Sequence, residues 1–312
     1  MQQLVFSFSV NCQQYFRRAP FQMTYMEQAQ LLRDAMKGAG TDENLIINIA
    51  TQYNWVEREQ IAKDFVSQFG LELSQQLKKE LSFNFENLMI GLFKNRHQFW
   101  AQQIYNAISG AGTNEKRLIT LILLMSDADV EETSIQYEKM YNKELFKAVV
   151  GDISNSDWGK LLKGWLKGQH EANIDHVQAA DDIYKASRKT GTDEDVFLRI
   201  LCNTSHECYG KIVQQYQQKY GTSINQLIKE EFAMRSEFAF LLAHEYLLNP
   251  FDAVQLILKQ SVVGAGTDDK MVIDLTVLFA DYFKGKLDIG ERLKKDLSGD
   301  YKAAVLKLWK VE

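Results

Sequence analysis

Residues 38–43 read Gly-Ala-Gly-Thr-Asp-Glu, and the chain repeats this phrase three more times. The later copies are Gly-Ala-Gly-Thr-Asn-Glu at 110–115, Thr-Gly-Thr-Asp-Glu at 190–194 and Gly-Ala-Gly-Thr-Asp-Asp at 264–269. The glycines that precede the threonines are 72, 79 and 75 residues apart, at Gly40, Gly112, Gly191 and Gly266. Recurrence at this interval predicts a tandem array of four similar structural units.

An acidic residue follows each of the first three glycines at a constant interval of 40 residues. These acids are Glu80, Asp152 and Glu231, and each precedes an apolar and then a small residue. The matching acid of the fourth unit, Asp296, comes only 30 residues after Gly266. A glycine loop and a distant carboxylate at fixed spacing indicate two halves of one ion site.

The spacing of apolar residues is helical almost throughout the chain. Leu45, Ile46, Ile49 and Ala50, for example, would share one helix face behind the first loop. Only two prolines occur, and no stretch alternates with a period of two for long. We therefore expect an all-α fold of four tandem repeats, each built from about five short helices.

We expect the repeats at residues 26–97, 98–172, 173–249 and 250–312, the last one shortened, with residues 1–25 as an N-terminal tail. The glycine loop should end the first helix of each repeat, because glycine accepts a left-handed backbone. The threonine behind it should be the N-cap of the second helix. A single copy of the phrase would favour a simple turn, whereas four copies with a phased acid favour an ion site.

Charge and cysteine content narrow the function. The formal net charge of −5 gives no bulk attraction to nucleic acid or to an anionic membrane. The three cysteines, an odd number without framework spacing, fit a reducing compartment. Cys202, His206 and Cys208 lack a second ligand pair, so we read them as helix residues rather than a zinc site. No apolar run approaches the roughly 18 residues of a membrane span.

Calcium is the ion that suits such a loop. It binds about six to eight oxygen atoms and accepts backbone carbonyls as well as carboxylates. Three loop carbonyls and a bidentate carboxylate would leave positions open for water or an external phosphate. Because one carboxylate only partly neutralises the ion, each site should be weak until an anionic ligand completes it. Several weak sites would add their affinities on one membrane.

The phrase at residues 35–43, Ala-Met-Lys-Gly-Ala-Gly-Thr-Asp-Glu, together with Leu-Lys-Lys-Glu-Leu-Ser at 77–82, resembles the signature of the annexin repeat. The resemblance covers residues 26–312. Residues 96–98, 157–166 and 306–311 are also similar to the divergent annexins of diplomonad protists, the α-giardins. The resemblance implies one curved array of repeats that binds acidic phospholipid membranes through Ca²⁺, in the cytoplasm and peripherally on the inner face of membranes.

Carried over by position, the resemblance implies calcium ligands in every repeat, as backbone carbonyls with one carboxylate. They are Met36, Gly38 and Gly40 with Glu80; Ile108, Gly110 and Gly112 with Asp152; Lys189 and Gly191 with Glu231; and Val262, Gly264 and Gly266 with Asp296. Lys189 replaces a glycine, and ten residues are missing before Asp296, so we expect sites one and two to be strongest and site four weakest. The loop residues Ala39, Ala111, Thr190 and Ala265 are small, which predicts contact with lipid headgroups.

Two functions other than calcium-dependent membrane binding are considered. No catalytic constellation of Ser, His and Asp or of Cys and His is evident, and the loops lack the Gly-Lys-Ser/Thr of a phosphate loop, so we expect no enzyme. The second functional hypothesis is a structural protein of flagella or cytoskeleton, with cytoskeletal partners and some or all calcium sites silent. The α-giardin resemblance raises this hypothesis.

Overall fold

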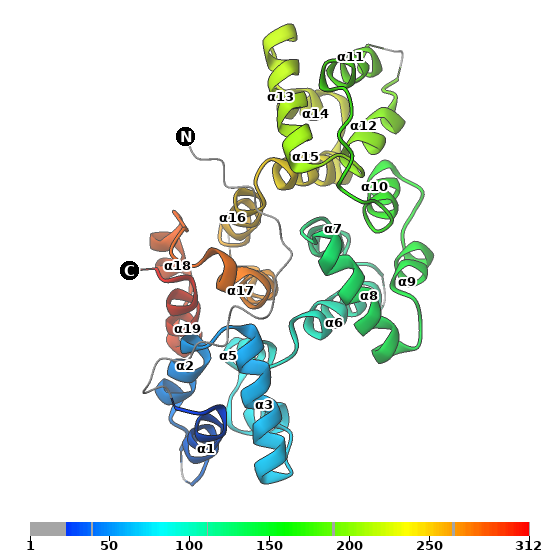
Figure 1. Cartoon of the computed structure of the whole chain (residues 1–312). Helices are drawn as coiled ribbons and strands as arrows, with labels where there is room; N and C mark the ends of the chain where they lie inside the picture. The colour runs from blue at the N-terminus through cyan, green and yellow to red at the C-terminus, as the bar shows by residue number, and fades with distance from the viewer. Residues whose placement is uncertain (1–22, 39, 111, 189–190, 264–265, 312) are drawn as a thin grey trace. The chain divides into compact units, whose positions relative to one another are not determined.

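The computed structural model describes residues 23–38, 40–110, 112–188, 191–263 and 266–311 (Figure 1). Within these ranges regular structure is α-helical, apart from one isolated bridge between Ala172 and Thr204, so the all-α prediction is confirmed. The chain divides into two compact units, Met1–Trp100 with Leu258–Glu312, and Ala101–Ile257. None of the helices so described is long and apolar enough to cross a membrane. Residues 1–22 of the predicted tail lie outside the described residues, while Thr24 is the N-cap of α1 and Tyr25 is its first residue.

Unit one contains helices from the first and the last repeat. They are α1 (Tyr25–Ala35), α2 (Glu43–Gln52), α3 (Trp55–Phe69), α4 (Leu73–Glu80), α5 (Phe83–Leu92), α17 (Asp269–Phe283), α18 (Gly290–Asp296) and α19 (Gly299–Trp309). Within it α19 packs against α2, and α17 packs against α5 and α19 (Figure 1). Two further helices, α6 (Arg96–Ile108) and α16 (Pro250–Ser261), contain the boundary between the units.

Unit two contains the helices of the second and third repeats. They are α7 (Glu115–Leu123), α8 (Asp127–Tyr141), α9 (Leu145–Asp152), α10 (Asp157–Trp165), α11 (His176–Ala186), α12 (Glu194–Leu201), α13 (His206–Tyr220), α14 (Ile224–Glu231) and α15 (Met234–Leu248). Here α15 packs against α7 and α10, and α11 packs against α13. Trp165 is fully buried, and its indole nitrogen donates to the carbonyl of Met125 at 3.2 Å.

The fourth repeat differs from the others between its loop and its acid. In repeat one, two helices, α2 and α3, lie between the loop and α4, and Glu80 is the last residue of α4. In repeat four the 15-residue helix α17 stands alone before α18, which ends at Asp296. The ten missing residues therefore correspond to a lost helix. The predicted repeat boundaries remain predictions, and the one at residue 97 lies just inside α6.

A buried ion pair joins repeat one to repeat four inside unit one. Arg58 of α3 is 1% exposed, and its Nη2 lies 2.7 Å from Oδ2 of Asp281 in α17. Its Nε donates to the carbonyl of Leu92 at 3.0 Å, so the buried guanidinium is hydrogen-bonded as well as paired. A charge in this position is tolerated only with such partners.

Candidate metal centre

All four glycine loops close in the same way. The residue after the threonine donates its backbone N–H to a carbonyl near the end of the preceding helix. The pairs are Asp42 to Ala35 at 2.9 Å, Asn114 to Ala107 at 2.8 Å, Asp193 to Ala186 at 3.2 Å and Asp268 to Ser261 at 2.8 Å. The same backbone hydrogen bond is thus present at this place in all four repeats.

The glycines of these loops adopt backbone angles that other residues avoid. Gly38 and Gly40 have φ of 105° and 104°, and Gly110 and Gly112 have φ of 128° and 107°. Glycine accepts such angles without strain because it has no Cβ. A glycine loop follows the end of the first helix as expected, but the glycine itself does not end it: α1 ends at Ala35, and its C-cap Met36 has φ of −103°.

The prediction that the threonine is the N-cap of the second helix is wrong. The cap is the next residue: Oδ1 of Asp42 accepts from the backbone N–H of Leu45 at 2.9 Å. Asn114 caps α7 and Asp268 caps α17 in the same way. The threonine is left with a different role, because its hydroxyl turns toward the distant acid.

A hydrogen bond connects each of the first three loops to its acid. Oγ1 of Thr41 donates to Oε2 of Glu80 at 3.1 Å. Thr113 donates to the carboxylate of Asp152, and Thr192 donates to that of Glu231. The interval of 40 residues in the sequence therefore corresponds to direct contact in space.

The three acids occupy equivalent and electrically unusual positions. Glu80, Asp152 and Glu231 are the last residues of α4, α9 and α14. The C-terminus of a helix carries a partial negative charge of about half an electron, so it repels a carboxylate at that position. Such a position is unfavourable for an unpaired acid and favourable for a bound cation.

The residues whose carbonyls are implied as ligands are only partly described by the structure. Met36 is the C-cap of α1, and Gly38 and Gly40 follow it in an exposed loop. Ile108 is the last residue of α6 before Gly110 and Gly112, and Gly191 precedes Thr192. Lys189 and Gly264, with the small loop residues at 39, 111, 190 and 265, lie outside the described residues. The oxygen donors present in repeats one and two fit calcium.

In repeat four an arginine, Arg292, contacts both the glycine loop and the acid. Nε of Arg292 donates to the carbonyl oxygen of Val262 at 3.0 Å and lies 3.8 Å from Oδ2 of Asp296. The guanidinium of Arg292 therefore contacts both the carbonyl and the carboxylate that were implied as calcium ligands. With these oxygen atoms already beside a positive charge, repeat four does not fit a calcium site. The sequence analysis missed Arg292. Its signal is a base four residues before the acid, where repeats one to three have Gln76, Ala148 and Leu227.

Side-chain clusters of the zinc type are not found among the described residues, where no three His, Cys, Asp or Glu side chains are placed to hold a metal. Cys202 and Cys208 make separate contacts with the carbonyls of Leu161 and Ile174. Nδ1 of His206 lies 2.9 Å from the carbonyl of Leu247. Burial raises the pKa of the Cys202 thiol to about 12, which is the environment of a packed residue rather than a ligand.

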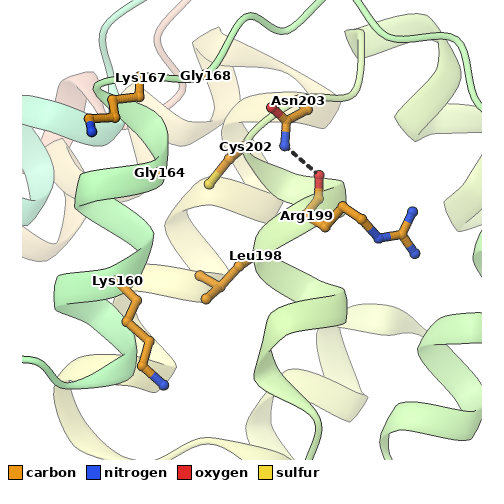
Figure 2. Close-up of a pocket in the computed structure, with 8 residues that line it drawn as sticks. All are labelled: Lys160, Gly164, Lys167, Gly168, Leu198, Arg199, Cys202 and Asn203. Atoms are coloured by element: carbon orange, nitrogen blue, oxygen red, sulfur yellow. Dashed lines mark hydrogen bonds between the residues drawn. The ribbon is translucent and has the colours of Figure 1, made fainter.

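A pocket between α10 and α12 contains three basic side chains, as Figure 2 shows. Each base already has a partner: Lys160 pairs with Asp157 at 3.6 Å, and Arg199 pairs with Asp182 at 3.1 Å. Lys167 lies over the ring of Phe146 at 4.2 Å. The bases are therefore neutralised or packed within the chain, and the pocket is not a ready-made anion site.

Comparison with known proteins places the chain among related sequences. A family model described as Annexin matches residues 27–92, 99–162 and 178–237. Human annexin A4 is 32% identical over 299 residues, which cover 91% of this chain and 93% of the relative. Annexin A7 of Dictyostelium discoideum is 32% identical over 295 residues, and the match spans 89% of this chain but 63% of that protein.

A solved structure gives the same picture of the fold. The calcium-bound structure of alpha-14 giardin superposes with a TM-score of 0.84 at 26% identity, covering 92% of this chain and 99% of the other. The resemblance to annexins and the resemblance to α-giardins are both confirmed. The fourth repeat, where α17 stands alone, lies outside the segments that the family model matches.

Proposed function

This chain belongs to the annexin family, and from that premise we propose that it binds acidic phospholipid membranes peripherally through Ca²⁺ held in its glycine loops. The observation that carries the proposal is the hydrogen bond between loop threonine and distant acid in repeats one, two and three. It holds the carboxylate against the loop threonine, which supports a site shared by loop and acid. A bound calcium would supply positive charge with coordination positions left open for a phosphate oxygen.

The residues of each loop have distinct tasks in this proposal. The positive φ of Gly38 and Gly40 turns the backbone so that successive carbonyls can share one ion. The threonine keeps Glu80 oriented toward the loop until calcium arrives. The protein has a net charge of −5 and would be repelled by an anionic membrane, so attachment depends on the cation between them.

The proposed sites differ in strength. Repeats one and two have two glycines and a threonine-bound acid, which supports calling them strongest. Repeat three has Lys189 in place of the first glycine but joins Thr192 to Glu231, so it comes next. In repeat four Arg292 supplies a positive charge between Val262 and Asp296, and a calcium ion would have to displace it. We therefore propose that the fourth site is silent or nearly so.

The alternative function is that of a cytoskeleton- or flagellum-associated structural protein whose calcium sites are largely silent. The arginine in repeat four favours silence at that site only. The hydrogen-bonded acids of the other repeats favour calcium binding. No enzymatic role is proposed. We place the protein's action in the cytoplasm, peripherally on the inner face of membranes.

A calcium titration of vesicle binding tests the proposal. The full chain is mixed with vesicles of equal parts phosphatidylserine and phosphatidylcholine and sedimented over a range of calcium concentrations. We expect binding that rises with calcium, is reversed by a chelator and is absent on pure phosphatidylcholine. Equal sedimentation with and without calcium would reject calcium bridging and would favour the structural role.

A further inference from the structure

Two apolar side chains are far more exposed than the others among the described residues. Phe83 is 86% exposed and Met234 is 88% exposed. The next large apolar side chain, Met26, is 53% exposed. Phe83 and Met234 therefore make almost no packing contribution to the units in which they lie.

Both side chains occupy the same position relative to a candidate calcium site. Phe83 begins α5 three residues after Glu80, and Met234 begins α15 three residues after Glu231. Three residues of chain span at most about 11 Å, so the Cα of each apolar residue lies within that distance of the Cα of its acid. Arg235, the neighbour of Met234, also pairs with Glu115 at 3.0 Å. Met234 thus lies near the loop of repeat two as well.

Both residues hold a backbone conformation that glycine would adopt more easily. Phe83 has φ of 54° and Met234 has φ of 52°, in the left-handed region that disfavours bulky residues. In repeat four the equivalent residue is Gly299, with φ of 60°. Repeat two has a longer connection, with the polar Asn155 at this distance from its acid. Neither internal packing nor backbone geometry explains a large apolar residue in repeats one and three.

We propose that Phe83 and Met234 enter the apolar part of a lipid bilayer when their repeats dock through calcium. The proposal rests on the proposed function and adds a contact that the small loop residues do not provide. Ser82 and Asn84 flank Phe83, and Ala233 and Arg235 flank Met234, so neither side chain has a large apolar residue directly beside it in the sequence. One side chain is too small for a protein interface, whereas a bilayer offers an apolar phase to any side chain that reaches it. The expectation of contact with headgroups alone then applies to repeats two and four.

Substitution by glycine separates membrane insertion from folding. Phe83→Gly and Met234→Gly remove the side chain and relieve the backbone strain, so the thermal midpoint should stay equal or rise. Binding to vesicles of equal parts phosphatidylserine and phosphatidylcholine at saturating calcium should weaken roughly tenfold for each variant. Asn142→Gly is the matched control, because Asn142 is exposed and polar with φ of 50°. It should not change vesicle binding.

A soluble headgroup distinguishes the lipid interior from the phosphate. The affinity for calcium with soluble phosphoserine, measured by calorimetry, should be unchanged in both glycine variants. A loss of affinity there would overturn insertion, since the side chain would then be supporting the headgroup site. If the double variant binds vesicles as the wild type does, insertion is wrong while calcium bridging stands. If the wild type itself shows no calcium-dependent binding, both proposals fail.

Discussion

The side chain of Arg292 donates from Nε to the carbonyl oxygen of Val262 at 3.0 Å, in the repeat whose acid comes ten residues early. The same guanidinium lies 3.8 Å from the carboxylate of Asp296. Loop and acid are thus connected in all four repeats, by a threonine in three of them and by an arginine in the fourth. In repeat four the positive charge of Arg292 contacts the loop carbonyl and the acid, and in the other repeats we propose that a calcium ion makes these contacts.

Arg292→Gln should therefore increase calcium binding by repeat four. The variant removes the positive charge and leaves the carbonyl of Val262 and the carboxylate of Asp296 available to an ion. Losing one such charge contact should improve affinity at this loop by about tenfold or more, equivalent to about 1.4 kcal/mol. Calorimetric titration would show a further calcium ion bound per chain. Arg235→Gln, which breaks the exposed pair with Glu115, should leave that number unchanged. An unchanged number in Arg292→Gln would contradict the proposed role of the arginine.

Glu80→Gln should weaken the first site while leaving the fold intact. The amide keeps the size and helix preference of the side chain, and its oxygen can still accept from Thr41. Removing the only charged ligand should lower calcium affinity at this loop by about tenfold or more. The unfolding free energy should change by less than about 0.5 kcal/mol, because the residue is exposed. Calorimetry and urea unfolding measure the two quantities. The pairing of loop one with Glu80 is wrong if the calcium titration matches that of the wild type.

The buried ion pair predicts a large loss of stability in Asp281→Ala. The variant leaves the guanidinium of Arg58, 1% exposed, without its carboxylate. Breaking a buried pair in this way typically costs about 3–5 kcal/mol. Asp182→Ala breaks the exposed pair with Arg199 and should cost less than about 1 kcal/mol. Urea unfolding compares the two variants, and equal losses would contradict the assigned role of the buried pair.

Acid should destabilise unit two through His244. Burial lowers the pKa of His244 to about 4, and the residue is 3% exposed, with Nδ1 2.7 Å from the Tyr209 hydroxyl. An unfolded histidine takes up a proton below about pH 6.5, whereas the folded one stays neutral until about pH 4. The contribution of this group to stability is therefore complete above about pH 6.5. It falls by about 1.4 kcal/mol per pH unit as the pH drops toward 4.

Urea unfolding at about pH 7 and about pH 5 measures this dependence. His244→Gln provides the reference, because it retains the carboxylates that also titrate in acid. The wild type should lose about 2 kcal/mol more than the variant over this interval. Equal losses would show that His244 does not stay neutral in the folded chain.

Local sequence features predicted the architecture well. The glycine phrases mark the loops between helices because the positive φ of their glycines is a local demand, and apolar periodicity marks the helices themselves. Similar local reasoning misassigned the N-cap. Both threonine and the following residue can cap a helix, and the choice depends on Glu80, which is distant in sequence. That contact exists only in the folded chain.

Three features that occur in individual repeats could not be predicted from the repeated sequence pattern. The early position of Asp296 indicated a rearrangement, but the spacing alone did not show that a single helix, α17, stands between the loop and α18. Arg292 is an ordinary base until α18 brings it to Val262. Phe83 looks like a core residue in its apolar segment, and its exposure follows from the positive φ with which α5 begins.

The central claim is that a glycine loop and the acid 40 residues later form one calcium site. A crystal structure of the protein soaked in calcium tests it most directly. We predict ions at the loops of residues 38–41 and 110–113, each coordinated by loop carbonyls with Glu80 or Asp152, and none at the loop that Arg292 contacts. Calcium at residues 264–267 before residues 38–41, or ions bound away from these acids, would contradict the account.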